Sequence, residues 1–151
     1  MNSHHTVAIG TWEGDKQQSI EYNSSIAVGI DCPRAKLRVS ILLDTIQEYQ
    51  VRYIFSDEEI SEAVNEAGLI IGARGIAYEG VLQRKPVIVV GEYGFGGLVT
   101  PDTLHEQYNN YFRGKINGIK AEYFSLERLE EEIRRGFALT FQELQMMSNN
   151  I

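Results

Sequence analysis

The hydrophobic residues of this 151-residue chain form short continuous runs that alternate with stripes of helical spacing. Two runs, residues 69–71 and 87–90, are mostly β-branched, which is typical of strands buried on both faces of a parallel sheet. Similar but weaker runs predict further strands. We expect these strands at residues 6–11, 25–30, 51–55 and 121–124, and a loop in the polar stretch 12–24.

The helical stripes lie between these runs. Leu42, Ile46 and Tyr49 follow i, i+4, i+7 spacing and predict an amphipathic helix. Ser56 stands three residues before Glu59, the spacing of a capping box at the start of the next helix. Other helices are expected between residues 72 and 86, within 102–111, after Ser125, and from the region of Gly136 to about Met147.

The regular alternation of strands and helices is the mark of parallel βαβ folding. It predicts an α/β fold, a single Rossmann-like domain with a mostly parallel sheet flanked by helices. At 151 residues the chain has the length of one ordinary domain, and we assign residues 1–151 to it. Residues 1–5 are expected to be disordered or tag-like.

Composition narrows the class of function. A net charge of −7 argues against general binding to nucleic acid or to an anionic membrane surface. No apolar stretch is long enough to span a bilayer and none resembles a signal peptide, so we expect a cytoplasmic protein without a membrane span. The single cysteine, Cys32, excludes an intrachain disulfide and a multi-cysteine zinc site.

Two glycine-rich segments follow the two clearest strands, at the ends where open α/β sheets bind ligands. The first holds Gly72, Ala73, Arg74 and Gly75; the second holds Gly94, Gly96, Gly97 and Thr100. Backbone N–H groups at a helix N-terminus attract anions, and Arg74 adds a charge for phosphate. Glu79, one helical turn further on, has the carboxylate that ribose hydroxyls require. The alternative is that these glycines only form turns, that Arg74 is solvated and that Glu79 lies on a helix surface.

Two further features carry open alternatives. The segment 108–120 mixes tyrosines with Arg113, Lys115 and Lys120, so it can stack a base and hold a phosphate, or its aromatic residues can simply anchor a surface loop. His105 can act as a base or a phosphate donor, or it can be an ordinary exposed histidine. The chain has no Asp-x-Asp motif for a metal-bound diphosphate, no P-loop and no nucleophile elbow, and no catalytic residue is assigned.

The motifs GARGIAYEG, KPVIVVG and GFGGLVTP resemble the C-terminal, donor-binding half of GT-B glycosyltransferases. The resemblance is close over about a fifth of the chain. It implies binding of a nucleotide-diphospho-sugar, with Glu79 on the ribose and both glycine segments on the diphosphate, assisted by Arg74 and by Arg113 or Lys115. It also implies no metal and no cofactor, and a role in the synthesis of a bacterial-type polysaccharide or glycoconjugate.

A complete GT-B enzyme has two Rossmann-like halves, and this chain has room for one. We therefore expect glycosyl transfer only if a partner chain or a further segment supplies the acceptor-binding half. The alternative hypothesis is a non-catalytic interaction module whose pocket has lost its function. An exposed apolar face around Phe137, Leu139 and Phe141 would favour that alternative.

Overall fold

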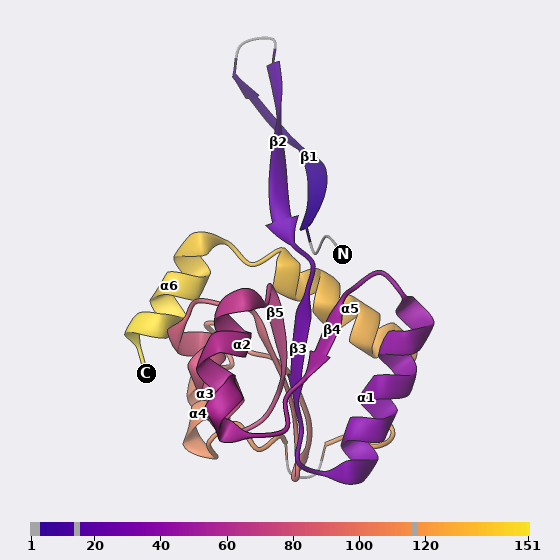
Figure 1. Cartoon of the computed structure of the whole chain (residues 1–151). Helices are drawn as coiled ribbons and strands as arrows, with labels where there is room; N and C mark the ends of the chain where they lie inside the picture. The colour runs from indigo at the N-terminus through magenta and orange to yellow at the C-terminus, as the bar shows by residue number, and fades with distance from the viewer. Residues whose placement is uncertain (1–3, 14–15, 116–117) are drawn as a thin grey trace.

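The main sheet has five strands in the spatial order β4-β3-β5-β6-β7 (Figure 1). The structure is a computed structural model that describes residues 4–13, 16–115 and 118–151. The strands are β3 (Ile26–Gly29), β4 (Val51–Tyr53), β5 (Leu69–Gly72), β6 (Val87–Gly91) and β7 (Gly94–Leu98). The first four are parallel to one another, and β7 runs antiparallel to β6. The predicted α/β class with a mostly parallel sheet is confirmed.

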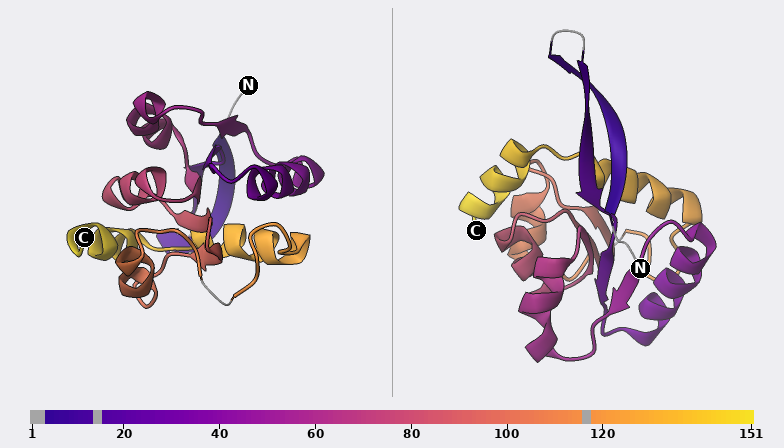
Figure 2. Two further views of the ribbon diagram at one scale, coloured as in Figure 1. Left: turned by 90° about the horizontal axis from the view of Figure 1, so that it is seen from below. Right: turned by 45° about the horizontal axis from the view of Figure 1, so that its top comes forward.

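Helices cover both faces of this sheet (Figure 2). One face carries α1 (Pro33–Ile46) and α5 (Leu126–Phe137). The other face carries α2 (Ile60–Glu66), which follows the short 3-10 helix η1 (Asp57–Glu59), together with α3 (Gly75–Leu82), α4 (Leu104–Asn109) and α6 (Phe141–Asn149). The arrangement is that of a single Rossmann-like domain.

Alternate residues of the central strands point into two separate cores. In β5, Ile71 packs in the core beneath α1 and α5, whereas Ile70 packs in the core beneath α2 and α3. In β6, Ile88 and Val89 divide in the same way, and all four side chains are fully buried. This two-sided burial explains why both strands are continuous apolar runs in the sequence, and it confirms both strand predictions.

The order of the strands creates a switch point between β3 and β5. From β3 the chain passes through α1 to β4 on one side, and then returns through α2 to β5 on the other side. Numbered along the chain, the sheet therefore has the doubly wound order 2-1-3-4-5. In such sheets the connections diverge at the carboxyl ends of the two strands and leave a crevice between them.

The N-terminal segment forms a separate antiparallel hairpin of β1 (His4–Glu13) and β2 (Lys16–Asn23), which projects from the main sheet (Figure 1). The loop predicted for residues 12–24 is therefore wrong over most of its length. That prediction rested on polar composition, and a hairpin strand outside a two-sided core has no need of an apolar run. Of the residues expected to be disordered or tag-like, His4 and His5 belong to β1, and residues 1–3 lie outside the described residues.

Three local predictions also need correction. Ser56 precedes η1 without a side-chain capping bond, because the chain there enters a 3-10 turn instead of an α-helix. Residues 121–124 form a turn and not a strand. The second glycine segment lies largely within β7 instead of a loop. By contrast, the Ser125 hydroxyl accepts a hydrogen bond from the Arg128 N–H at 3.1 Å, which confirms that cap.

Candidate functional site

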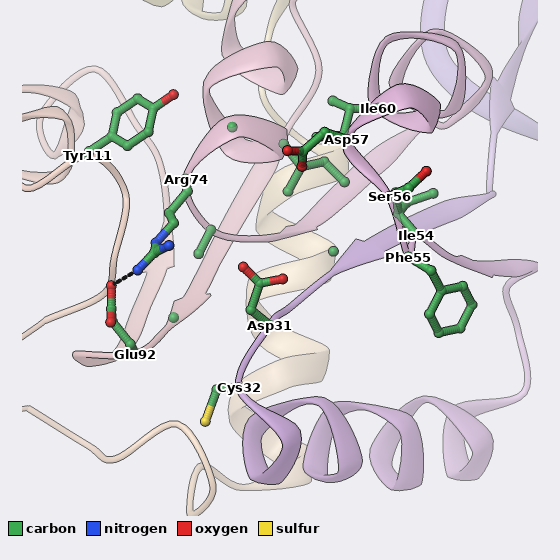
Figure 3. Close-up of a pocket in the computed structure, with 15 residues that line it drawn as sticks. Asp31, Cys32, Ile54, Phe55, Ser56, Asp57, Ile60, Arg74, Glu92 and Tyr111 are labelled. Atoms are coloured by element: carbon green, nitrogen blue, oxygen red, sulfur yellow. Dashed lines mark hydrogen bonds and ion pairs between the residues drawn. The ribbon is translucent and has the colours of Figure 1, made fainter.

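A cleft of about 680 Å³ opens at the carboxyl ends of β3, β4, β5 and β6, across the switch point (Figure 3). We call it the carboxyl-edge cleft. Each of the four strands contributes polar side chains from the segment that follows it: Asp31 after β3, Ser56 and Asp57 after β4, Arg74 after β5, and Glu92 after β6. These four segments, together with Tyr111 from the loop after α4, are far apart in the sequence and meet at the cleft.

Arg74, which precedes α3, has a backbone conformation that is unusual for a residue with a side chain. Its φ of 56° and ψ of −126° lie in a region that glycine normally occupies. The Arg74 N–H donates to the Phe112 carbonyl at 3.1 Å, and the Arg74 carbonyl accepts from the Tyr78 N–H at 2.9 Å. These bonds hold the strained backbone, and the side chain lies in the cleft.

An ion pair between Arg74 and Glu92 lies at one side of the cleft (Figure 3). The Arg74 guanidinium donates to Glu92 Oε1, and Arg113 Nε lies 3.4 Å from the same oxygen. Arg113 also donates to the Tyr93 hydroxyl at 3.3 Å. The hydrogen bond from Arg74 and the neighbouring positive charges lower the pKa of the Glu92 carboxyl below its ordinary value. The same hydrogen bond raises the pKa of Arg74.

The two glycines that flank the Ala73-Arg74 turn have different surroundings. A Cβ atom at Gly72 would lie 2.5 Å from the Gly29 carbonyl oxygen and 2.7 Å from Ile76 Cγ2, so packing alone requires glycine there. A Cβ atom at Gly75 would meet Ile60 Cδ1 at 3.8 Å as its nearest described neighbour, which is ordinary contact. Packing does not require glycine at position 75, and the backbone there faces the cleft.

The second glycine segment lies apart from the first. None of Gly94, Gly96, Gly97 and Thr100 is among the described residues that line the carboxyl-edge cleft. A Cβ at Gly96 would lie 2.6 Å from Gln107 Oε1, and the amide of Gln107 donates to the Gly96 carbonyl at 3.0 Å. Thr100 N–H donates to the Thr103 hydroxyl at 2.8 Å. Packing and turn formation therefore explain Gly96 and Thr100 without a ligand.

Glu79 is half-buried on α3 and does not line the carboxyl-edge cleft in the described part of the chain. Its carboxylate accepts a hydrogen bond from the Gln83 side-chain amide at 2.8 Å. The same amide donates to the Ser61 carbonyl at 3.1 Å, which links α3 to α2. The structure thus brings Ala73, Arg74 and Gly75 together in the cleft, with Gly72 directly behind them, and leaves Glu79 outside.

The aromatic segment after α4 divides between core and cleft. Phe112 is fully buried, whereas Tyr111 is 43% exposed and lines the carboxyl-edge cleft. The Tyr111 ring lies against Tyr78, with 6.1 Å between ring centroids. Lys115 lines a different hollow, beside Gln107, and His105 is exposed beside α6. Phe112 therefore anchors the segment in the core, whereas the Tyr111 ring is accessible from the cleft.

Sequence reasoning did not assign Asp31 or Glu92 to the site. Each stands just after a strand of the parallel sheet. Polar residues at the carboxyl ends of adjacent parallel strands come together at one edge of the sheet, so strand ends carried the missing signal. Assigning Asp31 required recognising β3 as the first strand of the main sheet.

Comparisons with known proteins do not assign the chain to a family. No family model, no curated protein and no solved structure matches the chain. Within residues 4–13, 16–115 and 118–151, no helix is long and apolar enough to cross a membrane. In the same part of the chain, no cluster of three or more histidine, cysteine, aspartate or glutamate residues is arranged to hold a metal ion.

Proposed function

We propose that the chain binds a nucleotide-diphospho-sugar in the carboxyl-edge cleft, as the donor half of a glycosyltransferase. The observation that carries the proposal is the position of Arg74 and Gly75, at the start of α3 and inside a cleft at the switch point. The proposal that the ligand is a phosphorylated nucleotide rests on this geometry. The sugar and the transfer reaction rest on the resemblance of residues 72–101 to GT-B glycosyltransferases.

The diphosphate is placed against the turn between β5 and α3. The first N–H groups of a helix have no partner within the helix, and the helix dipole favours negative charge beside them. Since Gly75 has no side chain, phosphate oxygens can approach these N–H groups closely. The Arg74 guanidinium supplies a charge-assisted donor from the same turn.

The nucleoside is placed along the walls of the same cleft. Tyr111 offers an exposed aromatic face on which a base can stack. The Asp31 carboxylate points into the cleft and is suited to accept hydrogen bonds from sugar hydroxyls (Figure 3). Glu79 was expected to bind the ribose, and Glu79→Ala and Asp31→Ala variants distinguish the two positions. Loss of nucleotide affinity in only one variant identifies the ribose ligand.

Transfer requires groups that this half does not supply alone. The turn before α3 would stabilise charge on the departing nucleoside diphosphate, which lowers the barrier to transfer. The acceptor and the catalytic base would come from a second half. Phe55, a residue of the cleft lining that is 76% exposed, is the feature that favours a protein partner at the mouth of the cleft.

The alternative is a non-catalytic interaction module, for which we expected an exposed apolar face around Phe137, Leu139 and Phe141. Phe137 and Leu139 are half-buried and pack against the core, and only Phe141 of the three expected residues is exposed. The apolar face expected around these residues is therefore not continuous.

Thermal melting with UDP, GDP, CDP, dTDP and ADP at millimolar concentration tests nucleotide binding. A ligand at about one hundred times its Kd stabilises the fold by roughly 2.7 kcal/mol, which raises the Tm by several degrees. We expect a rise with at least one nucleotide and its loss in Arg74→Gln. The matched control is Arg52→Gln, because Arg52 forms a similar exposed ion pair with Glu66 at 3.1 Å, outside the cleft. Flat melts with all five nucleotides would contradict the proposal.

A further inference from the structure

We infer that Glu92 is an internal competitor for the ligand: its carboxylate engages Arg74 and Arg113 when no ligand is bound, and the ligand's phosphate displaces it. This inference rests on the proposed function, because it concerns the same cleft. It assigns to Glu92 a role in setting affinity for anions, which neither its sequence position nor the family resemblance suggests.

The first argument is geometric. One oxygen of Glu92 is shared by guanidinium groups from two different segments, Arg74 before α3 and Arg113 in the loop after α4. An anionic oxygen between two guanidinium groups has the environment that a bound phosphate oxygen requires. Glu92 is also part of the cleft lining, so the carboxylate stands where a phosphate placed on Arg74 would lie.

The second argument is that Glu92 satisfies this pair of arginines incompletely. Arg113 Nε is buried and makes no hydrogen bond to any described residue, although Glu92 Oε1 is 3.4 Å away. The Glu92 carboxylate has two oxygens, and the same oxygen, Oε1, faces both arginines. A phosphate presents three oxygens and can accept hydrogen bonds from each guanidinium on a separate oxygen, which leaves fewer donors without a partner.

The third argument is that the Arg74–Glu92 pair is exchangeable. The side chains of Arg74 and Glu92 are 46% and 42% exposed, and ion pairs this open to water are weakly held. The backbone of Arg74 is fixed by its hydrogen bonds to Phe112 and Tyr78. Displacement of Glu92 therefore leaves the guanidinium in the cleft, where it meets the ligand.

A rival interpretation gives Glu92 a purely structural role, as a tether between the β6–β7 turn and the loop that contains Arg113. Backbone contacts already join these segments, since the Tyr93 N–H donates to the Arg113 carbonyl at 2.8 Å. The two interpretations predict opposite effects of neutralising Glu92. Competition predicts tighter anion binding, and tethering predicts weaker binding together with a lower Tm.

Isothermal titration calorimetry distinguishes the two interpretations of Glu92. The full chain is titrated with inorganic pyrophosphate and with the nucleoside diphosphate that raises the Tm. Glu92→Gln keeps the size of the side chain and removes its charge. We expect it to bind pyrophosphate at least about fivefold more tightly than the wild type at low salt, the factor that corresponds to the repulsion between two unit charges about 4 Å apart in water. The matched control, Glu66→Gln, removes a charge from the exposed Arg52 pair outside the cleft and should leave affinity unchanged.

The double variant Arg74→Gln/Glu92→Gln completes the test, because the gain in affinity should vanish when Arg74 is absent. Equal or weaker pyrophosphate binding by Glu92→Gln would overturn the inference. If the wild type still binds a nucleoside diphosphate in that case, the proposed function stands without it. If neither the wild type nor Glu92→Gln binds pyrophosphate or any of the five nucleotides, both the inference and the proposed function fail.

Discussion

At the scale of single residues, glycines that look equivalent in the sequence have different physical roles. Gly72 and Gly75 flank the same turn and were both assigned to the phosphate. The carbonyl of Gly29 fills the space beside Gly72, whereas the space beside Gly75 adjoins the cleft. Only the second glycine is therefore a candidate for close approach by a ligand.

Substitution of these two glycines by alanine tests that distinction. Gly75→Ala adds a methyl group at the first position of α3, so the free energy of unfolding should stay within about 1 kcal/mol of the wild type. Nucleotide binding should fall at least tenfold, because the methyl group covers the N–H groups. Gly72→Ala should lower the free energy of unfolding by about 1–3 kcal/mol. Urea denaturation and calorimetric titration measure both effects, and wild-type affinity in Gly75→Ala would contradict the assignment.

The ion pair of Glu92 gives a prediction about pH. Because hydrogen bonding to Arg74 lowers the pKa of Glu92, the pair stabilises the folded state above the ordinary carboxyl pKa of 4.5. This contribution is lost as the pH falls through the lowered pKa. NMR titration of the Glu92 carboxyl carbon should give a pKa below 4.5, and Arg74→Gln should return it toward that value. A Glu92 pKa that is the same in both proteins would show that the pair does not form in solution.

At the scale of secondary-structure elements, the strands that are buried on both faces were the ones that the sequence predicted most directly. The strands β5 and β6 are buried on both faces, so their apolar runs identified them directly. Neither β2 nor β7 was predicted, because β2 is polar and β7 consists mostly of glycine. Pairing with a neighbouring strand determines both elements, and pairing leaves little trace in local composition.

Helix caps show the same dependence on context. Thr140 forms a complete capping box at the start of α6: its hydroxyl accepts from the Glu143 N–H at 3.1 Å, and Glu143 accepts from the Thr140 N–H at 3.0 Å. Ser56 has the same sequence signature and makes no capping bond. The signature is local, whereas the entry of the chain into the helix depends on the strand before it.

Two alanine substitutions measure this difference. Thr140→Ala should lower the free energy of unfolding by about 1 kcal/mol and the Tm by about 2–4 °C. Ser56→Ala should change the free energy of unfolding by less than about 0.5 kcal/mol, because no hydrogen bond is lost. Thermal and urea unfolding of the two variants provide the comparison. An equal loss of stability in both would show that Ser56 caps its helix in solution.

At the scale of the whole molecule, the order of the strands determines which residues meet. The sequence predicted the parallel sheet and the turn that contains Arg74, and the topology adds Asp31 and Glu92 to the same cleft. The same topology carries the second glycine segment away from the cleft, because β7 pairs antiparallel with β6 and runs from Gly94, beside Gly91, toward the opposite edge of the sheet. The strand ends in the sequence were a signal for Asp31 and Glu92, whereas the direction of β7 depends on its pairing with β6, which local sequence patterns could not supply.

We propose that the diphosphate binds at the turn before α3. Backbone NMR of the uniformly ¹⁵N-labelled chain, titrated with the nucleoside diphosphate that raises the Tm, tests this claim most directly. We expect the largest amide shifts at Gly75, Ile76 and Glu92, with small shifts at Gly96 and Gly97. Shifts centred on Gly96 and Gly97, or no shifts at saturating nucleotide, would contradict it.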